Sequence, residues 1–144
     1  QFIARSFPQA KLLPADPLDE MKAVSLMAWL TSTVHPHLTP NVRPENYCDI
    51  PEAHEGVKRV AQKLLMEDLK IAEDLLAGRD WFFDHFTAVD AYFFWCFRRA
   101  IQLKLDLSAF PNCLAHLARM RTRPSVQKVE AYEKEVAAQF AKAA

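Results

Sequence analysis

The chain has 144 residues, 51% of them hydrophobic and 25% charged, which is the composition of a globular protein of single-domain size. Its 18 lysines and arginines balance 18 aspartates and glutamates, so charge gives no reason to expect a nucleic acid or an anionic membrane as partner. The two glycines, Gly56 and Gly78, nearly exclude glycine-rich phosphate loops and glycine-dependent hairpins, and their scarcity favours an all-α chain.

The chain opens with QFIARSFP, which is typical of a helix tail that ends at Pro8, and a connector rich in proline follows. Asp16 is a good N-cap and Pro17 suits a first helical position, so we expect a helix over residues 17–35 that Pro36 and Pro40 end. Its apolar positions are Leu18, Met21, Val24 and Met27, with Leu26, Trp29 and Leu30 widening the face.

A long irregular loop with four prolines, HPHLTPNVRPENYCDIPEAH, precedes the second strong helix. That helix keeps a spacing of three to four residues between apolar positions and should end at Gly78, a natural C′ residue. The apolar positions are Val57, Val60, Ala61, Leu64, Leu65, Leu69, Ala72, Leu75 and Leu76.

Three more helices are predicted in the second half of the chain. The one that follows Thr87 is apolar nearly all round over residues 91–100, which places it at the centre of a bundle. After the break at LDLSAFPN, a short helix spans about residues 111–121. A last helix spans about residues 125–140, with Val126, Val129, Tyr132, Val136 and Phe140 on one side. The pattern predicts an all-α bundle of about five helices.

Thr87 and Asp90 have the spacing of a capping box, with Asp in place of the commoner Glu or Gln. The threonine hydroxyl would accept from the N–H of Asp90, and the carboxylate would accept from the N–H of Thr87. Such a cap is worth about 1 kcal/mol, and more when buried. We therefore interpret Asp90, at the head of a very apolar run, as structural rather than catalytic.

Cys48, Cys96 and Cys113 are odd in number and form no CxxC pair, which indicates a reducing compartment such as the cytoplasm. No apolar run has the length of a membrane span, and no signal peptide is recognisable. Cys96 should pack as a small hydrophobe. Cys113 begins a helix whose dipole would lower a thiol pKa, but packing is the favoured interpretation there too.

The remaining polar residues suggest no metal site. Pro36 separates His35 from His37, no Cys, Asp or Glu stands at ligand spacing, and the other histidines, His54, His85 and His116, are scattered. Trp81, Phe82 and Phe83 are interpreted as packing, and Arg98 and Arg99 as a polar strip paired with an acidic residue.

The stretch GRDWFFDHFTAVDAYFFW is similar to the one that opens the core helix of the glutathione S-transferase C-terminal domain. Phe86, Thr87 and Asp90 match the family pattern, whereas Asp84 and Val89 stand where the family commonly has Gly and Ala. FPQAKLLPADPLDEMKAVSLMAWL and FPNCLAHLARMRTRPSVQK resemble further family segments in the right order, so the resemblance covers almost the whole chain.

The resemblance implies an all-α domain that normally follows a thioredoxin-like domain, which binds glutathione and carries the residue that activates its thiol. Because the chain begins with Gln1 and not Met, we expect it to be part of a longer protein. Residues 1–8 would be the tail of the missing domain's last helix, residues 9–16 a linker, and residues 17–144 the helical domain.

By the same resemblance, the first helix of the domain would line the pocket for a hydrophobic electrophile with Trp29, Ser32, His35 and Leu38. Bacterial beta-class members often have Ser-x-x-His near this point, and Ser32 and His35 have that spacing. Two interpretations of His35 stay open: a contact to glutathione, or a helix-end histidine stabilised by the helix dipole or water.

The predicted function is that of the electrophile-binding domain of a cytoplasmic, homodimeric glutathione transferase that detoxifies hydrophobic electrophiles. Glutathione would be its cosubstrate, no metal would be bound, and the fragment alone would be inactive. The alternative is a non-catalytic interaction module, as the same domain is appended to some translation proteins. An unrelated helical bundle is a third possibility that the ordered motifs disfavour.

Overall fold

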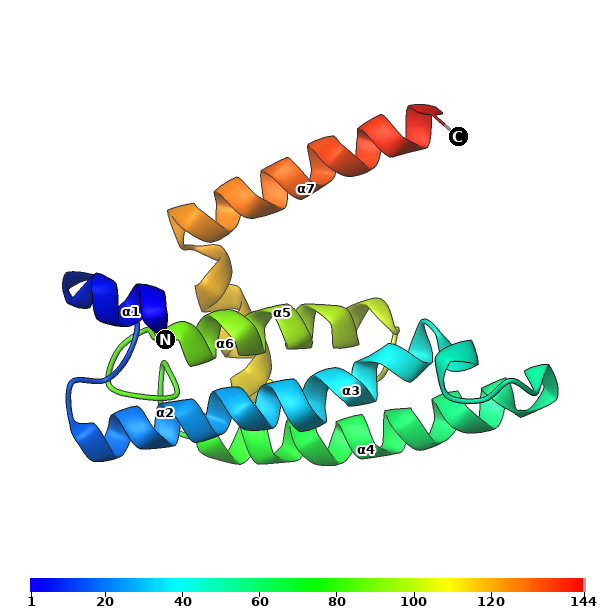
Figure 1. The fold of residues 1–144 in the computed structure, drawn as a ribbon, viewed down its shortest axis with the longest axis horizontal. Coiled ribbons are helices and arrows are strands. Elements are labelled where there is room, and N and C mark those ends of the chain that lie inside the picture. The colour runs from blue at the N-terminus through cyan, green and yellow to red at the C-terminus, as the bar shows by residue number, and fades with distance from the viewer. Residues whose placement is uncertain (144) are drawn as a thin grey trace.

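A computed structural model describes residues 1–143, and all the regular structure in this range is helical, which confirms the predicted fold class (Figure 1). The α-helices are α1 (Phe2–Ser6), α2 (Pro17–Trp29), α3 (His35–Leu38), α4 (His54–Leu75), α5 (Ala88–Gln102), α6 (Pro111–Arg121) and α7 (Pro124–Ala143). A π-helical turn occupies Leu30–Val34, and single 3₁₀ turns occupy Pro8–Ala10, Thr39–Asn41, Pro44–Asn46 and Pro51–Ala53.

The first long helix starts as predicted but does not stop at Pro36. Asp16 caps α2, its Oδ1 accepting from the N–H groups of Leu18 and Asp19 at 3.0 Å each. The predicted end at His35 is wrong, because the π-helical turn leads directly into α3, which continues to Leu38. In that turn the N–H of His35 bonds the carbonyl of Leu30, five residues back. The wider turn gives the ring of Pro36 the room that a regular α-helix denies it.

Helix α5 lies at the centre of the bundle, in contact with α2, α3 and α6 (Figure 1). Phe93 and Phe97 are the largest fully buried side chains of the core, and their rings stack with centroids 5.6 Å apart. Leu30, Leu65 and Leu69 from the neighbouring helices are also fully buried. The continuous apolar surface predicted for α5 therefore has packing partners on several sides.

Helix α4 packs one face on this core, as its periodicity predicted, with Ala61, Leu65 and Ala72 buried. Two residues predicted for this apolar face, Val60 and Leu75, are exposed to solvent. The helix ends in a turn in which Gly78 adopts a left-handed conformation, φ +70°, that glycine takes without strain.

Helix α7 leaves the end of α6 and runs away from the rest of the bundle (Figure 1). It is held near α5 by the predicted ion pair of Arg98, whose Nη2 lies 2.5 Å from Glu133. Arg121 adds a bond to Glu130 at 3.2 Å. The predicted apolar side is open, and Tyr132 and Phe140 are 65% and 74% exposed.

Candidate functional site

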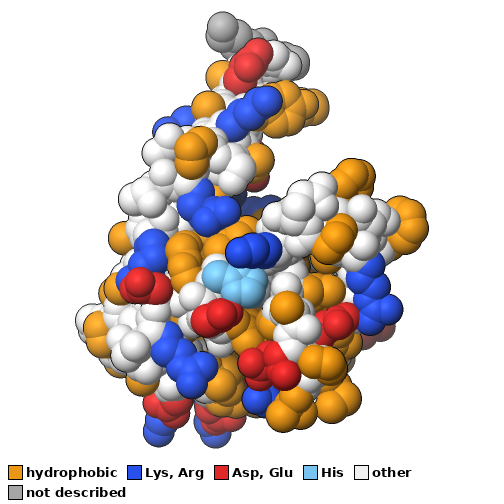
Figure 2. Space-filling model, turned by 90° about the vertical axis from the view of Figure 1, so that its left-hand side faces the viewer, with side chains coloured by type: hydrophobic (Ala, Val, Ile, Leu, Met, Phe, Trp, Pro, Cys, Tyr) orange, Lys and Arg blue, Asp and Glu red, His pale blue; other side chains and the backbone are white. Residues whose placement is uncertain are grey.

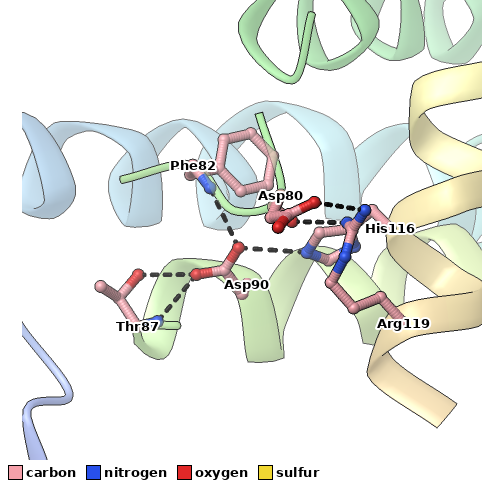
Figure 3. A network of polar contacts seen from close by, with 6 residues as sticks. All are labelled: Asp80, Phe82, Thr87, Asp90, His116 and Arg119. Atoms are coloured by element: carbon pink, nitrogen blue, oxygen red, sulfur yellow. Dashed lines mark hydrogen bonds and ion pairs between the residues drawn. The ribbon is translucent and has the colours of Figure 1, made fainter. Parts of the chain in front are cut away.

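The start of α5 is organised by a buried carboxylate (Figure 3). Thr87 is the extended N-cap residue and forms a capping box with Asp90, whose side chain is fully buried. Asp90 Oδ2 accepts from the Thr87 N–H at 2.8 Å and from the Thr87 hydroxyl at 3.0 Å. The cap therefore satisfies a helix-start donor that would otherwise be orphaned inside the core.

The second oxygen of Asp90 ties two more segments to the same point. Oδ1 accepts from the N–H of Phe82 at 3.1 Å and lies 3.1 Å from Nε2 of His116, on α6 (Figure 3). The His116 ring is buried among aromatic side chains, with centroid distances of 5.5–5.8 Å to Trp81, Phe82 and Phe93. One carboxylate thus joins the loop before α5, α5 itself and α6, and it is sealed from solvent.

Sequence reasoning missed His116. Its place on α6 gave a usable signal, because residues 113, 116, 117 and 120 follow the period of one helical face, and all four are buried. Next to this network, Arg119 bonds the carbonyl of Asp80 at 2.7 Å and its carboxylate at 2.6 Å (Figure 3).

A second cluster lies between α3 and α5 and is partly open to solvent. His35 Nδ1 is 3.0 Å from the Tyr92 hydroxyl, and the His35 ring packs on Trp95 with centroids 4.6 Å apart. All three side chains are half-buried. Arg99, which is exposed, lies over the Trp95 ring with its Cζ 5.4 Å from the centroid. We call these four residues, His35, Tyr92, Trp95 and Arg99, the aromatic face.

The other residues predicted for the electrophile side lie in different environments. Trp29 is half-buried, and Ser32 is exposed with its hydroxyl 3.5 Å from that of Thr33. Leu38 belongs to the core, with 5% of its surface exposed. Within the described residues no hydrogen bond joins Ser32 to His35: Ser32 lies in the π-helical turn, and His35 is the first residue of α3.

Another buried carboxylate, Asp68 on α4, pairs with His37 Nδ1 at 2.6 Å. Burial raises the pKa of Asp68, and the hydrogen bond from His37 partly opposes this increase. No cluster of three or more potential metal ligands occurs in the part of the chain that the structure describes.

The cysteine environments favour packing over reactivity. Burial raises the pKa of Cys96 to about 12. Burial also raises the pKa of Cys113, and the nearby Glu73 carboxylate adds to the effect. Glu73 accepts from the N–H groups of Asn112 and Cys113 at 2.9 and 3.0 Å, so it takes up the donors at the α6 start. The surroundings of Cys113 therefore do not activate its thiol, although it lies at the start of α6.

Apolar side chains are exposed at the end of the molecule that carries the N-terminus. Phe2, Ile3 and Phe7 are 83%, 65% and 53% exposed, and Leu18 and Met21 at the start of α2 are 56% and 62% exposed. Figure 2 views this end and shows hydrophobic side chains interspersed with charged ones and a histidine around a hollowed surface. The first segment, α2 and the loop at residues 82–85 line the hollow. No helix among the described residues is long and apolar enough to cross a membrane.

Comparisons with known proteins point to one family. Residues 40–119 match the family model described as glutathione S-transferase, C-terminal domain. The glutathione S-transferase GstA of Escherichia coli O157:H7 is 30% identical over 129 residues, which cover 88% of this chain. This chain spans only 61% of the length of that relative.

Solved structures agree in fold. A glutathione transferase homologue from Sulfitobacter with bound glutathione superposes with a TM-score of 0.83 at 21% identity, over 92% of this chain and 64% of that one. The bacterial beta class glutathione S-transferase of Sphingomonas chungbukensis has a TM-score of 0.75 at 26% identity, over 88% of this chain and 61% of that one.

Proposed function

This chain belongs to the family of glutathione S-transferase C-terminal domains, and we propose that it supplies the electrophile side of a glutathione transferase active site. The observation that carries this proposal is the aromatic face, because flat apolar side chains gather there around a histidine on a surface that is still partly open.

The proposed reaction is attack by the thiolate of glutathione on an electrophilic carbon. A C–S bond forms, and a leaving group departs with its electron pair or a double bond accepts the pair. Trp29 and Ser32 are proposed to belong to the electrophile side as well, with Leu38 as part of the core behind it.

His35 is proposed to hold the thiolate or a glutathione carboxylate. When the Tyr92 hydroxyl donates to Nδ1, the neutral imidazole carries its proton on Nε2. The Nε2–H group then donates to an anion. Tyr92 acts through His35, by fixing its tautomer and orientation.

A preceding thioredoxin-like domain is proposed to bind glutathione and to supply the thiol-activating residue. In this arrangement residues 1–8 end that domain, residues 9–16 are the linker, and residues 17–144 are the helical domain. The exposed Phe2, Phe7 and Met21 support this arrangement, since an apolar surface of this kind usually has a covering partner. The relative's greater length supports it too. We further propose a cytoplasmic homodimer with a role in detoxification.

The test compares two proteins made from the same gene: the chain extended upstream of Gln1, and residues 1–144 alone. Conjugation of glutathione to 1-chloro-2,4-dinitrobenzene is measured for both. We expect activity from the extended protein and none from residues 1–144. Conjugation by residues 1–144 would refute the need for a second domain. An inactive extended protein, or an upstream region of the kind found in translation proteins, would favour the interaction module instead.

A matched pair of variants of the extended protein tests the site itself. His35→Gln removes the proposed contact, whereas His54→Gln changes a histidine that bonds the carbonyl of Cys48 elsewhere. A hydrogen bond to a charged group is worth about 1.5–3 kcal/mol, so His35→Gln should lower kcat/KM at least about tenfold. Equal losses of kcat/KM in the two variants would show that His35 is not part of the site.

A further inference from the structure

The position of Arg99 bears on which electrophile the aromatic face would take. Tyr92, Trp95 and Arg99 follow one another at intervals of three and four residues on α5, so they share one side of the helix. The guanidinium lies over the Trp95 ring, and Trp95 packs on His35. This stacking places a fixed positive charge on the wall that carries the proposed site histidine.

Arg99 differs from nearby arginines in what it pairs with. Arg98 pairs with Glu133 at 2.5 Å and lies 3.7 Å from Glu130. Arg99 instead donates from Nη1 to the neutral side-chain oxygen of Gln102 at 3.1 Å, and no carboxylate pairs with it among residues 1–143. Its remaining N–H groups keep the geometry that suits a carboxylate or another planar anion.

We infer that the electrophile is an aromatic or similarly flat molecule that carries an anionic group, and that Arg99 selects it. The flat part packs on Trp95 and His35, and the anion accepts from the guanidinium of Arg99. This inference rests on the proposed function, because it names the class of substrate for that site. It makes Arg99 a specificity residue with no part in thiol activation.

The test uses residues 1–144 and two probes of nearly the same shape, 2-naphthoate and the neutral 2-naphthamide. Binding is followed by NMR at the indole N–H of Trp95. We expect the dissociation constant of the carboxylate to be about tenfold lower, because a charge-assisted hydrogen bond is roughly twice as strong as a neutral one. Equal affinities, or no shift of the Trp95 signal with naphthoate, would overturn the inference.

Variants separate a specific contact from general charge attraction. Arg99→Met should abolish the preference for the carboxylate, and Arg99→Lys should keep only part of it. Arg59→Met removes an exposed arginine on α4 and should leave the preference unchanged. All three substitutions are at exposed positions, and circular dichroism checks that each variant is folded. Equal losses in Arg59→Met and Arg99→Met would refute the role of Arg99.

Glutathione is the last probe, since its own carboxylates are possible ligands of a guanidinium. If glutathione alone shifts the Trp95 signal and displaces naphthoate, Arg99 belongs to the cosubstrate site and the inference fails. The titration needs no conjugation, so its outcome is independent of transferase activity. An active extended protein with a failed titration would refute only the substrate class.

Discussion

Replacing Asp90 by alanine should destabilise the whole bundle, because one carboxylate serves three segments. The change leaves the N–H groups of Phe82 and Thr87 and the ring N–H of His116 without their acceptor. All three residues are buried, at 4%, 0% and 1% exposure. A stranded buried donor costs about 1–3 kcal/mol, and removing one partner of a buried pair costs about 3–5 kcal/mol in total.

We therefore expect Asp90→Ala to lower the free energy of unfolding by about 3–5 kcal/mol, out of the roughly 5–15 kcal/mol typical of a domain. For a chain of this size, that corresponds to a fall in Tm of roughly 10–15 °C. Far-UV circular dichroism during urea and thermal unfolding measures both quantities. The stability of the Asp90→Asn protein should lie between those of the wild type and the Asp90→Ala protein, because the one amide oxygen can replace only one of the two carboxylate oxygens as acceptor.

Asp106→Ala is the matched control, because this exposed aspartate also accepts a backbone bond, from the N–H of Ser108 at 3.0 Å. It should have little effect on unfolding. An Asp90→Ala protein as stable as the Asp106→Ala protein would refute the assignment of Asp90 as the tie between segments.

Three further outcomes are expected. Arg98→Met removes the ion pairs to Glu130 and Glu133 and should speed amide hydrogen exchange in α7 while leaving α5 protected; unchanged exchange in α7 would contradict this. The raised pKa of Asp68 means that its carboxyl group holds a proton more tightly in the folded than in the unfolded protein. The free energy of unfolding of the wild type, relative to that of Asp68→Asn, should therefore fall as the pH rises from the ordinary pKa of 3.8 through the raised pKa. Urea unfolding across that range measures the difference, and the opposite slope would show that the His37 contact outweighs burial. Of the three free cysteines, only half-exposed Cys48 should react quickly with a thiol reagent in the native state, and fast reaction of all three would contradict the burial of Cys96 and Cys113.

Helix positions were predictable where local chemistry decides them. Proline at the first helical position and the periodic apolar residues place α6 at residues 111–121, as observed. The spacing of Thr87 and Asp90 is likewise a local pattern. The bond from His116 is not local, because it joins residues 26 apart in the chain, and no spacing rule links them.

Two differences from the sequence-based expectations have specific causes. Proline ends regular α-helices, but the rule assumes a regular turn before it, and the π-helical turn at residues 30–34 removes that assumption. Periodicity showed which residues of α7 share a side. It carries no information on whether another element covers that side, and Tyr132 and Phe140 are in fact open.

The aromatic face was only partly visible in the sequence. His35 stood out from a family pattern, whereas Tyr92 and Trp95 lay within a run that was apolar in every direction, so periodicity could not single them out. Their meeting with His35 depends on how α3 and α5 pack, which is a tertiary property.

The π-helical turn also means that this helix carries one residue more than a regular α-helix of the same course would need. Loss of a single codon there would restore a regular helix, and the segment beyond it, including His35, would keep its register. Related genes that lack one residue in this stretch would thus keep the same side chain against Trp95, and only the side chains of the turn itself would change direction. A one-residue difference at this turn therefore changes the surface of residues 30–34 and leaves the contact between α3 and α5 intact.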